Sequence, residues 1–151
     1  MNNQTDSKPH QPDVFCPYCG NAAELVTGKE IYPALPKLRH SLFYSCLPCK
    51  AYVGTHGDGR PLGTLANAEL RHQRRNTHHV FDRLWQAGLM SRSQCYRWMA
   101  DTLGITAEQA HIAMLNPEQC MALREAASKM LNHLLATRTN KPKPPRDTRR
   151  R

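Results

Sequence analysis

The sequence lacks any long apolar run. No apolar segment approaches the roughly 20 residues that a membrane-spanning helix needs, so we expect neither a membrane span nor a membrane partner. Residues 1–13, MNNQTDSKPHQPD, are polar and lack the apolar stretch of a secretory signal peptide. The mean hydropathy of −0.65 indicates a polar surface or disordered ends. We therefore predict a cytosolic protein with a disordered N-terminus at 1–13.

Acidic residues are scarce in two parts of the chain. Residues 37–97 carry ten basic and three acidic side chains, a net charge of +7, and the last fourteen residues carry seven and one, giving +6. Residues 1–36 and 98–137 each come to −2, so the total of +9 arises from a central block and a tail. Such charge fits a polyanionic partner, although it serves solubility equally often.

Four of the six cysteines form two Cys-x-x-Cys pairs. The pairs CPYC and CLPC are separated by 26 residues, enough for a hairpin to bring them together. In a reducing compartment such pairs favour a metal site, with disulfides or redox-active thiols as the alternatives. Zinc prefers four thiolates in a tetrahedron. We predict one structural zinc ion, without an open position for a substrate, on Cys16, Cys19, Cys46 and Cys49.

The order of strand and helix signals predicts an α+β fold. Residues 14–56 contain three short strand candidates, 23–26, 42–45 and 51–55, which we expect to form a small antiparallel zinc ribbon. Residues 57–137 begin with a turn-rich junction and contain about four predicted α-helices, packed on the ribbon. Residues 138–151 have no apolar side chain, so this basic tail is predicted to be disordered.

Capping signals delimit the expected helices. Thr64 is predicted to begin a helix that runs to about residue 87, and the capping box at 91–94 to open a second helix that stops at Gly104. A similar signature at 106–109 predicts a short helix to about residue 115. Pro117 starts the last helix. Its apolar stripe comprises Cys120, Leu123, Ala127, Met130, Leu131 and Leu134.

Two features of these helices invite a functional interpretation that we do not favour. Cys95 and Cys120 fall on apolar helix faces, and we expect them to be small buried hydrophobic residues rather than a second metal site. Residues 96–114 loosely match a helix-turn-helix, a motif whose second helix enters the DNA major groove. Here that second helix carries neither Lys nor Arg. A helical hairpin is the simpler interpretation.

The predicted helix after Thr64 contains RHQRRNTHH, nine residues without a large apolar side chain. Four of them share one helix face, at steps of three and four residues: Arg71, Arg74, Arg75 and His78. Phosphate groups would relieve their mutual repulsion and match the planar fork of arginine. We therefore expect nucleic-acid contacts here and at the tail residues Arg149, Arg150 and Arg151. The alternative is a solvated face, partly offset by Glu69 and Asp82.

Several of these motifs occur together in a known family. The run CPYCG is followed by CxxCxAYVGTH, then PLGTLANAELRHQR, His79, FDRLW and YRWMADTLGI. Over about residues 15–120 the chain resembles the zinc-finger-containing domain family of phages, prophages and other bacterial mobile elements. The resemblance implies metal binding by the four cysteines and a second signature of His56, Pro61, Leu62, Gly63, Leu70, Arg71, Arg75, His79, Phe81, Asp82 and Trp85. It implies a fold and a mobile-element origin, and no activity.

Three hypotheses about function follow. The leading one is a small cytosolic protein that contacts the phosphates of DNA or RNA through its basic helix and tail. A second is a protein-interaction module that binds a host enzyme, such as a polymerase or nuclease, through the acidic C-terminal helices. A third is an enzyme with a polar cluster of His56, Arg75, His79 and Asp82. No nucleophile–base–orienter set is recognisable, so we predict no catalytic residue.

Overall fold

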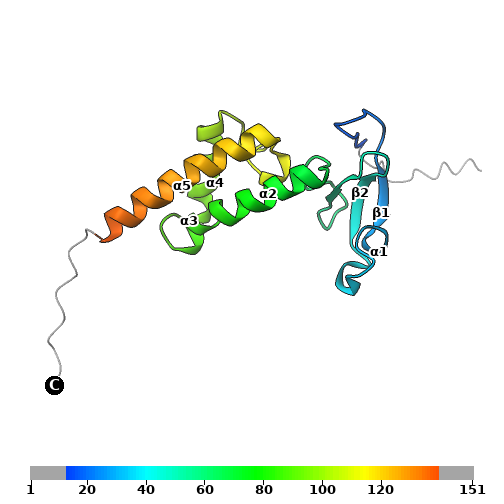
Figure 1. Ribbon diagram of the computed structural model, residues 1–151, viewed down its shortest axis with the longest axis horizontal. Helices are drawn as coiled ribbons and strands as arrows, with labels where there is room; N and C mark the ends of the chain where they lie inside the picture. The colour runs from blue at the N-terminus through cyan, green and yellow to red at the C-terminus, as the bar shows by residue number, and fades with distance from the viewer. Residues whose placement is uncertain (1–12, 140–151) are drawn as a thin grey trace, which may run out of the picture.

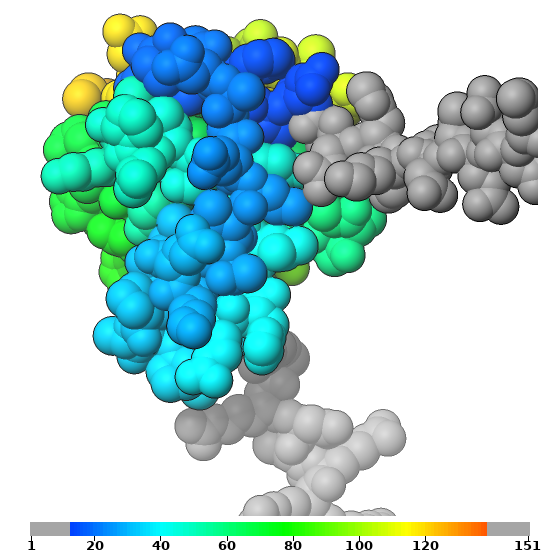
Figure 2. Space-filling view, turned by 90° about the vertical axis from the view of Figure 1, so that its right-hand side faces the viewer, coloured from blue at the N-terminus to red at the C-terminus, as the bar shows by residue number. Residues whose placement is uncertain are grey.

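The computed structural model describes residues 13–139. It has the predicted α+β composition, with a small sheet followed by helices. Figure 1 shows an elongated molecule in which the sheet forms one end and the helices extend from the helix α2 (Ala68–Phe81) toward the other. Figure 2 looks onto the sheet end, where residues of the ribbon, in blue to cyan, cover most of the visible surface. Within residues 13–139 no helix combines the length and the apolar content needed to traverse a lipid bilayer.

Three antiparallel strands form the sheet in the order β1-β2-β3. They are β1 (Glu24–Thr27), β2 (Leu42–Cys46) and β3 (Ala51–Gly54), each within one residue of its predicted ends. A short helix α1 (Gly28–Ile31) and a 3-10 turn η1 (Pro36–Leu38) connect β1 to β2. Gly28 has no room for a side chain because the carbonyl group of Leu38 lies against it. This close approach folds the connection back on itself.

The two faces of the sheet differ in burial, because side chains alternate along each strand. One face is buried and packs on Leu65; it consists of Tyr44, Cys46, Ala51 and Val53. On the other face, Phe43 lies opposite Gly54 and Ser45 lies opposite Tyr52. Phe43 and Tyr52 are only half-buried. The sheet therefore has one covered face and one open face that carries aromatic rings.

The helices follow the ribbon in the predicted order. After α2 come α3 (Arg83–Gln86), α4 (Arg92–Leu103), a 3-10 turn η2 (Ile112–Met114) and α5 (Pro117–Thr139). In Figure 1, α2 and α5 lie side by side. The Thr77 hydroxyl donates to the Cys120 carbonyl at 3.4 Å near the start of α5, and Arg138 donates to the Ala87 carbonyl at 3.2 Å near its end. The two helices therefore run parallel, and α5 includes two residues that the sequence assigned to the tail.

The main core lies between the helices. Large, fully buried side chains come from α2, α3, α4 and α5, among them Phe81, Leu84, Met99 and Leu123. The predicted stripe on α5 faces this core: Cys120, Leu123, Ala127 and Leu131 are buried, while Met130 and Leu134 pack at its margin. Cys95 and Cys120 are both fully buried, which confirms that they pack as small hydrophobic residues.

The helix predicted with Thr64 as its N-cap begins three residues later, with Asn67 as its N-cap. The Asn67 side chain accepts a backbone N–H of the first turn at 3.0 Å. Thr64 Oγ1 instead accepts a bond from Arg74 Nη2 at 2.6 Å. Between them, Ala66 pairs with Tyr52 of β3 through two backbone bonds of 3.0 and 3.1 Å. The predicted start is wrong because this segment extends the ribbon before the helix begins.

The short helix predicted from Thr106 is also wrong. Thr106 and Gln109 do exchange the two capping bonds, each at 3.2 Å. No α-helix follows, because His111 is extended (φ −134°, ψ 135°), and its neighbours Ala110 and Ile112 are both buried. Residues two apart lie on one side of an extended chain, whereas on a helix they are about 200° apart. Residues 96–114 therefore do not form a helix-turn-helix.

Candidate metal centre

A tight turn positions the first two cysteines. The Cys16 N–H donates to the Asn21 carbonyl and the Gly20 N–H to the Cys16 carbonyl, both at 2.8 Å. Gly20 has a φ of +75°, a left-handed conformation that glycine adopts without steric cost. The turn leaves Cys16 buried and Cys19 exposed.

A second turn of the same kind follows β2. Cys46 is the last residue of that strand, and Cys49 stands two residues before β3. Lys50 follows Cys49 as Gly20 follows Cys19, and it too is left-handed, with a φ of 52°. Its N–H donates to the Leu47 carbonyl at 3.1 Å. Both Cys-x-x-Cys pairs are therefore followed by a residue with a positive φ, although only one of these two residues is glycine.

The two turns bring the four predicted sulfur atoms together. The Sγ atoms of Cys16, Cys19, Cys46 and Cys49 all lie within 4.8 Å of one another, and those of Cys19 and Cys46 are 3.6 Å apart. Zinc–sulfur bonds of about 2.3 Å in a tetrahedron place sulfur atoms about 3.8 Å apart. A disulfide needs about 2.05 Å, and all six cysteines are free. The spacing fits a metal ion and not a disulfide.

The surroundings of Cys16, Cys46 and Cys49 shift the pKa values of these three thiols. Burial raises the pKa of Cys16, but hydrogen bonds from the N–H groups of Tyr18 and Cys19 lower it, and the net pKa is about 7. Contact with the Cys19 thiol, followed by burial, raises the pKa of Cys49 to about 12. The Cys49 N–H lowers the pKa of Cys46. Burial and the neighbouring thiols outweigh this effect, so the pKa of Cys46 is raised overall. Four thiolates this close require a cation among them, and this donor set fits zinc.

Comparison with known families agrees with this chemistry. Residues 12–130 match a family described as a zinc-finger-containing domain. The chain belongs to this family. Within its zinc-finger-containing domain, the four-cysteine cluster supplies the metal-binding set that the family description implies. The searches against curated proteins and solved structures returned no match. The family resemblance of the sequence is thus confirmed, while the mobile-element origin stays a prediction.

The two Cys-x-x-Cys turns also contact the start of α2. Tyr18, between the first two cysteines, accepts the Asn67 N–H on its hydroxyl at 3.1 Å. The carbonyl of Lys50, directly after the last cysteine, accepts a bond from Arg71 Nη1 at 3.1 Å. Four sulfur ligands fill a tetrahedral ion and leave no position for a substrate. The arrangement therefore suits a structural zinc that holds the ribbon against α2.

The predicted arginine face divides into buried and exposed residues. Arg74 is only 8% exposed and donates to the carbonyls of Thr64 and Leu115 and to the Thr64 hydroxyl, at 2.6 to 3.1 Å. Arg74 therefore links two segments of the fold by hydrogen bonds and is not the surface phosphate ligand expected from the sequence. Arg75 and His78 are exposed as expected. The tail residues Arg149, Arg150 and Arg151 lie outside the described part of the chain.

Arg71 occupies an intermediate position, over an aromatic ring. Its Cζ lies 3.9 Å from the ring centroid of Tyr52, and its Nη1 donates to the Ala66 carbonyl at 2.6 Å. Tyr52 donates to the Tyr32 hydroxyl at 2.9 Å. Burial, and then this bond, raise the pKa of Tyr52 to about 12, although Arg71 and Arg75 act in the opposite direction. Tyr52 is therefore a neutral phenol beside two arginines.

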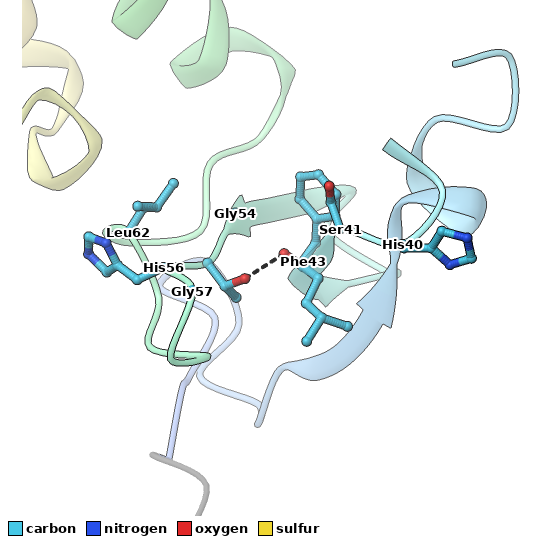
Figure 3. Close-up of a pocket in the computed structure, with 9 residues that line it drawn as sticks. His40, Ser41, Phe43, Gly54, His56, Gly57 and Leu62 are labelled. Carbon is cyan, nitrogen blue, oxygen red and sulfur yellow. Dashed lines mark hydrogen bonds between the residues drawn. The ribbon is translucent and has the colours of Figure 1, made fainter. Parts of the chain in front are cut away.

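Two residues of the enzyme hypothesis line adjoining cavities, and a third lies just beyond the far end of α2. His56 lines a cavity of about 450 Å³ beside β2 and β3, shown in Figure 3. Arg75 lines an adjoining cavity of about 300 Å³ between the sheet and α2. Asp82, near the far end of α2, lies 3.4 Å from His78 Nδ1, so its ion-pair partner is His78 and not His79. This placement offers no shared centre for acid–base chemistry.

The aromatic residues around Arg71 were not recognised as site residues in the sequence. Alternation along β2 and β3, combined with the register of the hairpin, places Phe43 and Tyr52 on one face. That signal is present in the sequence and could have identified both rings. Tyr32 lies in the connection after α1, where no periodic pattern predicts its position.

Proposed function

We propose that this protein binds nucleic acid through a positively charged surface that the zinc ribbon and α2 form together. The supporting observation is a lack of counter-ions. The ion pairs within residues 13–139 use the carboxylates of Asp58, Asp82 and Glu125, and none of them involves an arginine of α2. Arg71 and Arg75, the arginines of α2 that are not buried, therefore carry charge that no carboxylate of the described chain neutralises at close range. Nucleic-acid phosphates would supply the missing charge.

The guanidinium group of Arg71 is oriented by the fold and keeps N–H groups available for an anion. Its bonds to Ala66 and Lys50 both use Nη1, so Nε and Nη2 make no hydrogen bond to residues 13–139. The contact with Tyr52 orients the plane of the guanidinium group. A side chain fixed in this way loses less conformational entropy when it binds. Arg75, one helical turn along, is exposed on the same face.

Zinc contributes to this surface by position rather than by chemistry. The turn that contains Cys49 ends at Lys50, whose carbonyl orients Arg71. The other turn contacts Asn67 at the N-cap of α2 through Tyr18. In this proposal the metal joins the arginines of α2 to the open face of the sheet.

Replacing Arg71 and Arg75 together with glutamine tests the proposal. Each lost phosphate contact should flatten the slope of log affinity for duplex DNA against log salt by about 0.9. Arg83→Gln with Arg97→Gln is the matched control, because both arginines are exposed and the net charge changes equally. We expect the control to keep the wild-type slope. Equal slopes in all three proteins would contradict the proposal.

The basic tail is a separable part of the same proposal. Deleting residues 140–151 removes six basic side chains and one acidic one. Because counterion release grows with each phosphate contact, the deletion should weaken binding most at low salt. The thermal midpoint of unfolding should be unchanged. A fall in that midpoint would mean that the tail packs on the fold, contrary to the sequence prediction.

Binding of a protein is a second candidate, supported by an apolar spot on α5. Met121 is 60% exposed and lines a cavity of about 300 Å³ between Glu118 and Glu125. This is the acidic helix surface proposed from the sequence as a contact for a host enzyme. Met121→Glu should then remove a stoichiometric partner that survives nuclease treatment, without changing DNA binding. Recovery of no such partner from the native host would leave nucleic acid as the ligand.

We infer the origin and location of the protein from the family resemblance. The motifs shared with the phage and mobile-element family support an origin in such an element and a site of action in the bacterial cytoplasm. Phage or integrase genes beside its own gene would support this origin. A position among conserved housekeeping genes would contradict it.

A further inference from the structure

We propose that the open face of the sheet stacks unpaired bases, so that the preferred ligand is single-stranded nucleic acid. This inference rests on the proposed nucleic-acid function and specifies its ligand. Its basis is the aromatic face, formed by Tyr32, Phe43 and Tyr52, which lines one cavity together with Arg71 and Arg75. Aromatic rings beside a basic groove are the means by which proteins hold single strands without reading a duplex.

The three rings of the aromatic face contact one another edge to face. The ring centroids are 5.6 to 6.2 Å apart and the ring planes meet at 67° to 89°. Each edge-to-face contact covers a face of only one of its two rings, so these contacts leave other ring faces of the cluster uncovered by one another. Phe43 and Tyr32 are half-buried and line a cavity of about 300 Å³. Part of each ring is therefore accessible to a ligand in this cavity.

The hollow continues beyond the aromatic face. Phe43, Gly54 and Leu62 line both this cavity and the adjoining one of about 450 Å³. In Figure 3, Phe43 lies centrally, and His40 and His56 stand at opposite sides. A Cβ on Gly54 would lie 3.2 Å from Leu62 Cδ1. Glycine at this position therefore leaves space in the cavity next to its strand partner Phe43. The two cavities together form a surface larger than one base would cover.

The charge around the hollow favours a nucleic acid over a peptide. No carboxylate lines either cavity, whereas Arg71 and Arg75 border the aromatic face. Phosphates at these arginines would leave the attached bases to lie against Phe43 and Tyr32. In a duplex the bases are already stacked and paired, so exposing one to Phe43 costs unpairing energy. A single strand presents its bases without that cost.

The test compares Phe43→Leu with Phe15→Leu in the full chain. Leucine stays apolar but has no π face, and Phe15 is a matched control because it is a 59% exposed aromatic residue of the ribbon outside the aromatic face. The probes are labelled single-stranded DNA of about 12 nucleotides, RNA of the same sequence, and the DNA duplex. The two single strands show whether the sugar matters. Zinc content and circular dichroism check that each variant is folded.

We expect the wild-type protein to prefer the single strands. Phe43→Leu should weaken single-strand binding by about tenfold, with little effect on the duplex and no change in the salt slope. Phe15→Leu should match the wild type. The unchanged slope separates stacking from phosphate contact, since only the arginine variants should flatten it. If Phe43→Leu does not fold, Tyr32→Leu makes the same test outside the strands.

Equal affinity for single strand and duplex, unaffected by Phe43→Leu, would overturn this inference and leave the arginine-dependent binding intact. Binding to none of the probes would overturn the proposed function itself. Phe43→Leu could also lose a protein partner that the wild type recovers from the native host, while its affinity for single strands stays unchanged. That result would assign the aromatic face to a protein and overturn the inference.

Discussion

The ribbon and the helical region are ordered by different means. The buried cluster of the ribbon has six residues, and two of them, Cys16 and Cys46, belong to the predicted zinc site. The buried cluster of the helices has thirteen, including large side chains such as Phe81, Met99 and Leu123. A cluster as small as that of the ribbon removes too little apolar surface from water to offset the entropy of ordering the chain. A metal ion bound by the four cysteines would contribute what the apolar residues do not.

The difference explains where the candidate binding surface can form. The open face of the sheet keeps Phe43 and Tyr52 partly exposed, an arrangement that a fold stabilised by apolar burial would tend to cover. Because four thiolates can supply the folding energy, the ribbon can leave these rings available. The helical region contributes its own packing and supplies Arg71 and Arg75 from a rigid helix.

Removing zinc should produce the largest effect and separate the two regions. Structural zinc contributes on the order of 10 kcal/mol to folding, so Cys46→Ser or strong chelation should unfold the ribbon. Amide signals of α2, α4 and α5 should persist. Because the ligands bind as thiolates, acidification should release zinc in the same way. Metal analysis and amide NMR spectra measure both effects.

The matched control for Cys46→Ser is Cys120→Ala, which removes a cysteine that lies in the helical core. It should retain about one equivalent of zinc. An ordered ribbon in Cys46→Ser, with no zinc bound, would refute the statement that the ribbon needs zinc to fold.

Truncating the helical core tests the other half. Leu123 is fully buried, and Leu123→Ala should lower the free energy of unfolding of the helices by roughly 3 kcal/mol. Leu135→Ala makes the same chemical change on the same helix at a 37% exposed position, and its effect should be much smaller. Denaturant unfolding followed by circular dichroism measures both. Zinc release in Leu123→Ala under native conditions would show that the two regions unfold as one unit.

Arg74 joins elements at the boundary, and its replacement should have an intermediate effect. In Arg74→Gln the buried carbonyl of Leu115 and the partly buried carbonyl of Thr64 lose charge-assisted hydrogen bonds. The expected loss of unfolding free energy is about 2 kcal/mol. Arg75→Gln, one residue away and exposed, should leave stability within error. Similar stabilities in the two variants would mean that the Arg74 contacts contribute little.

Features that depend on neighbours in the sequence could be predicted. The Cys-x-x-Cys spacing brings two sulfur atoms to one ion within each turn, and the apolar steps on α5 identify its buried face. The left-handed position after the first pair is marked by Gly20. In each case the residues that determine the structure lie within a few positions of one another.

Features that depend on residues far apart in the sequence could not be predicted. The helical period placed Arg74 on a face with Arg71, but it could not show that Leu115 lies opposite and buries it. Thr64 has the chemistry of an N-cap, yet pairing of Ala66 with β3 keeps the chain extended past it. Tyr32 reaches Tyr52 through a connection that has no periodic pattern. These long-range contacts decide the composition of the candidate surface.

The smallest predicted effect compares the two zinc turns directly. A left-handed conformation costs a residue with a Cβ roughly 1 kcal/mol more than glycine, and Lys50 carries that cost at φ 52°. Lys50→Gly should therefore raise zinc affinity modestly, by up to about fivefold, while Lys50→Ala, which loses the same charge, should not. Gly20→Ala should lower affinity by a similar factor, since its Cβ would meet no atom within 4 Å and only the backbone conformation opposes it. Chelator competition measures all three; equal affinities in Lys50→Gly and Lys50→Ala would mean that the turn conformation does not limit metal binding.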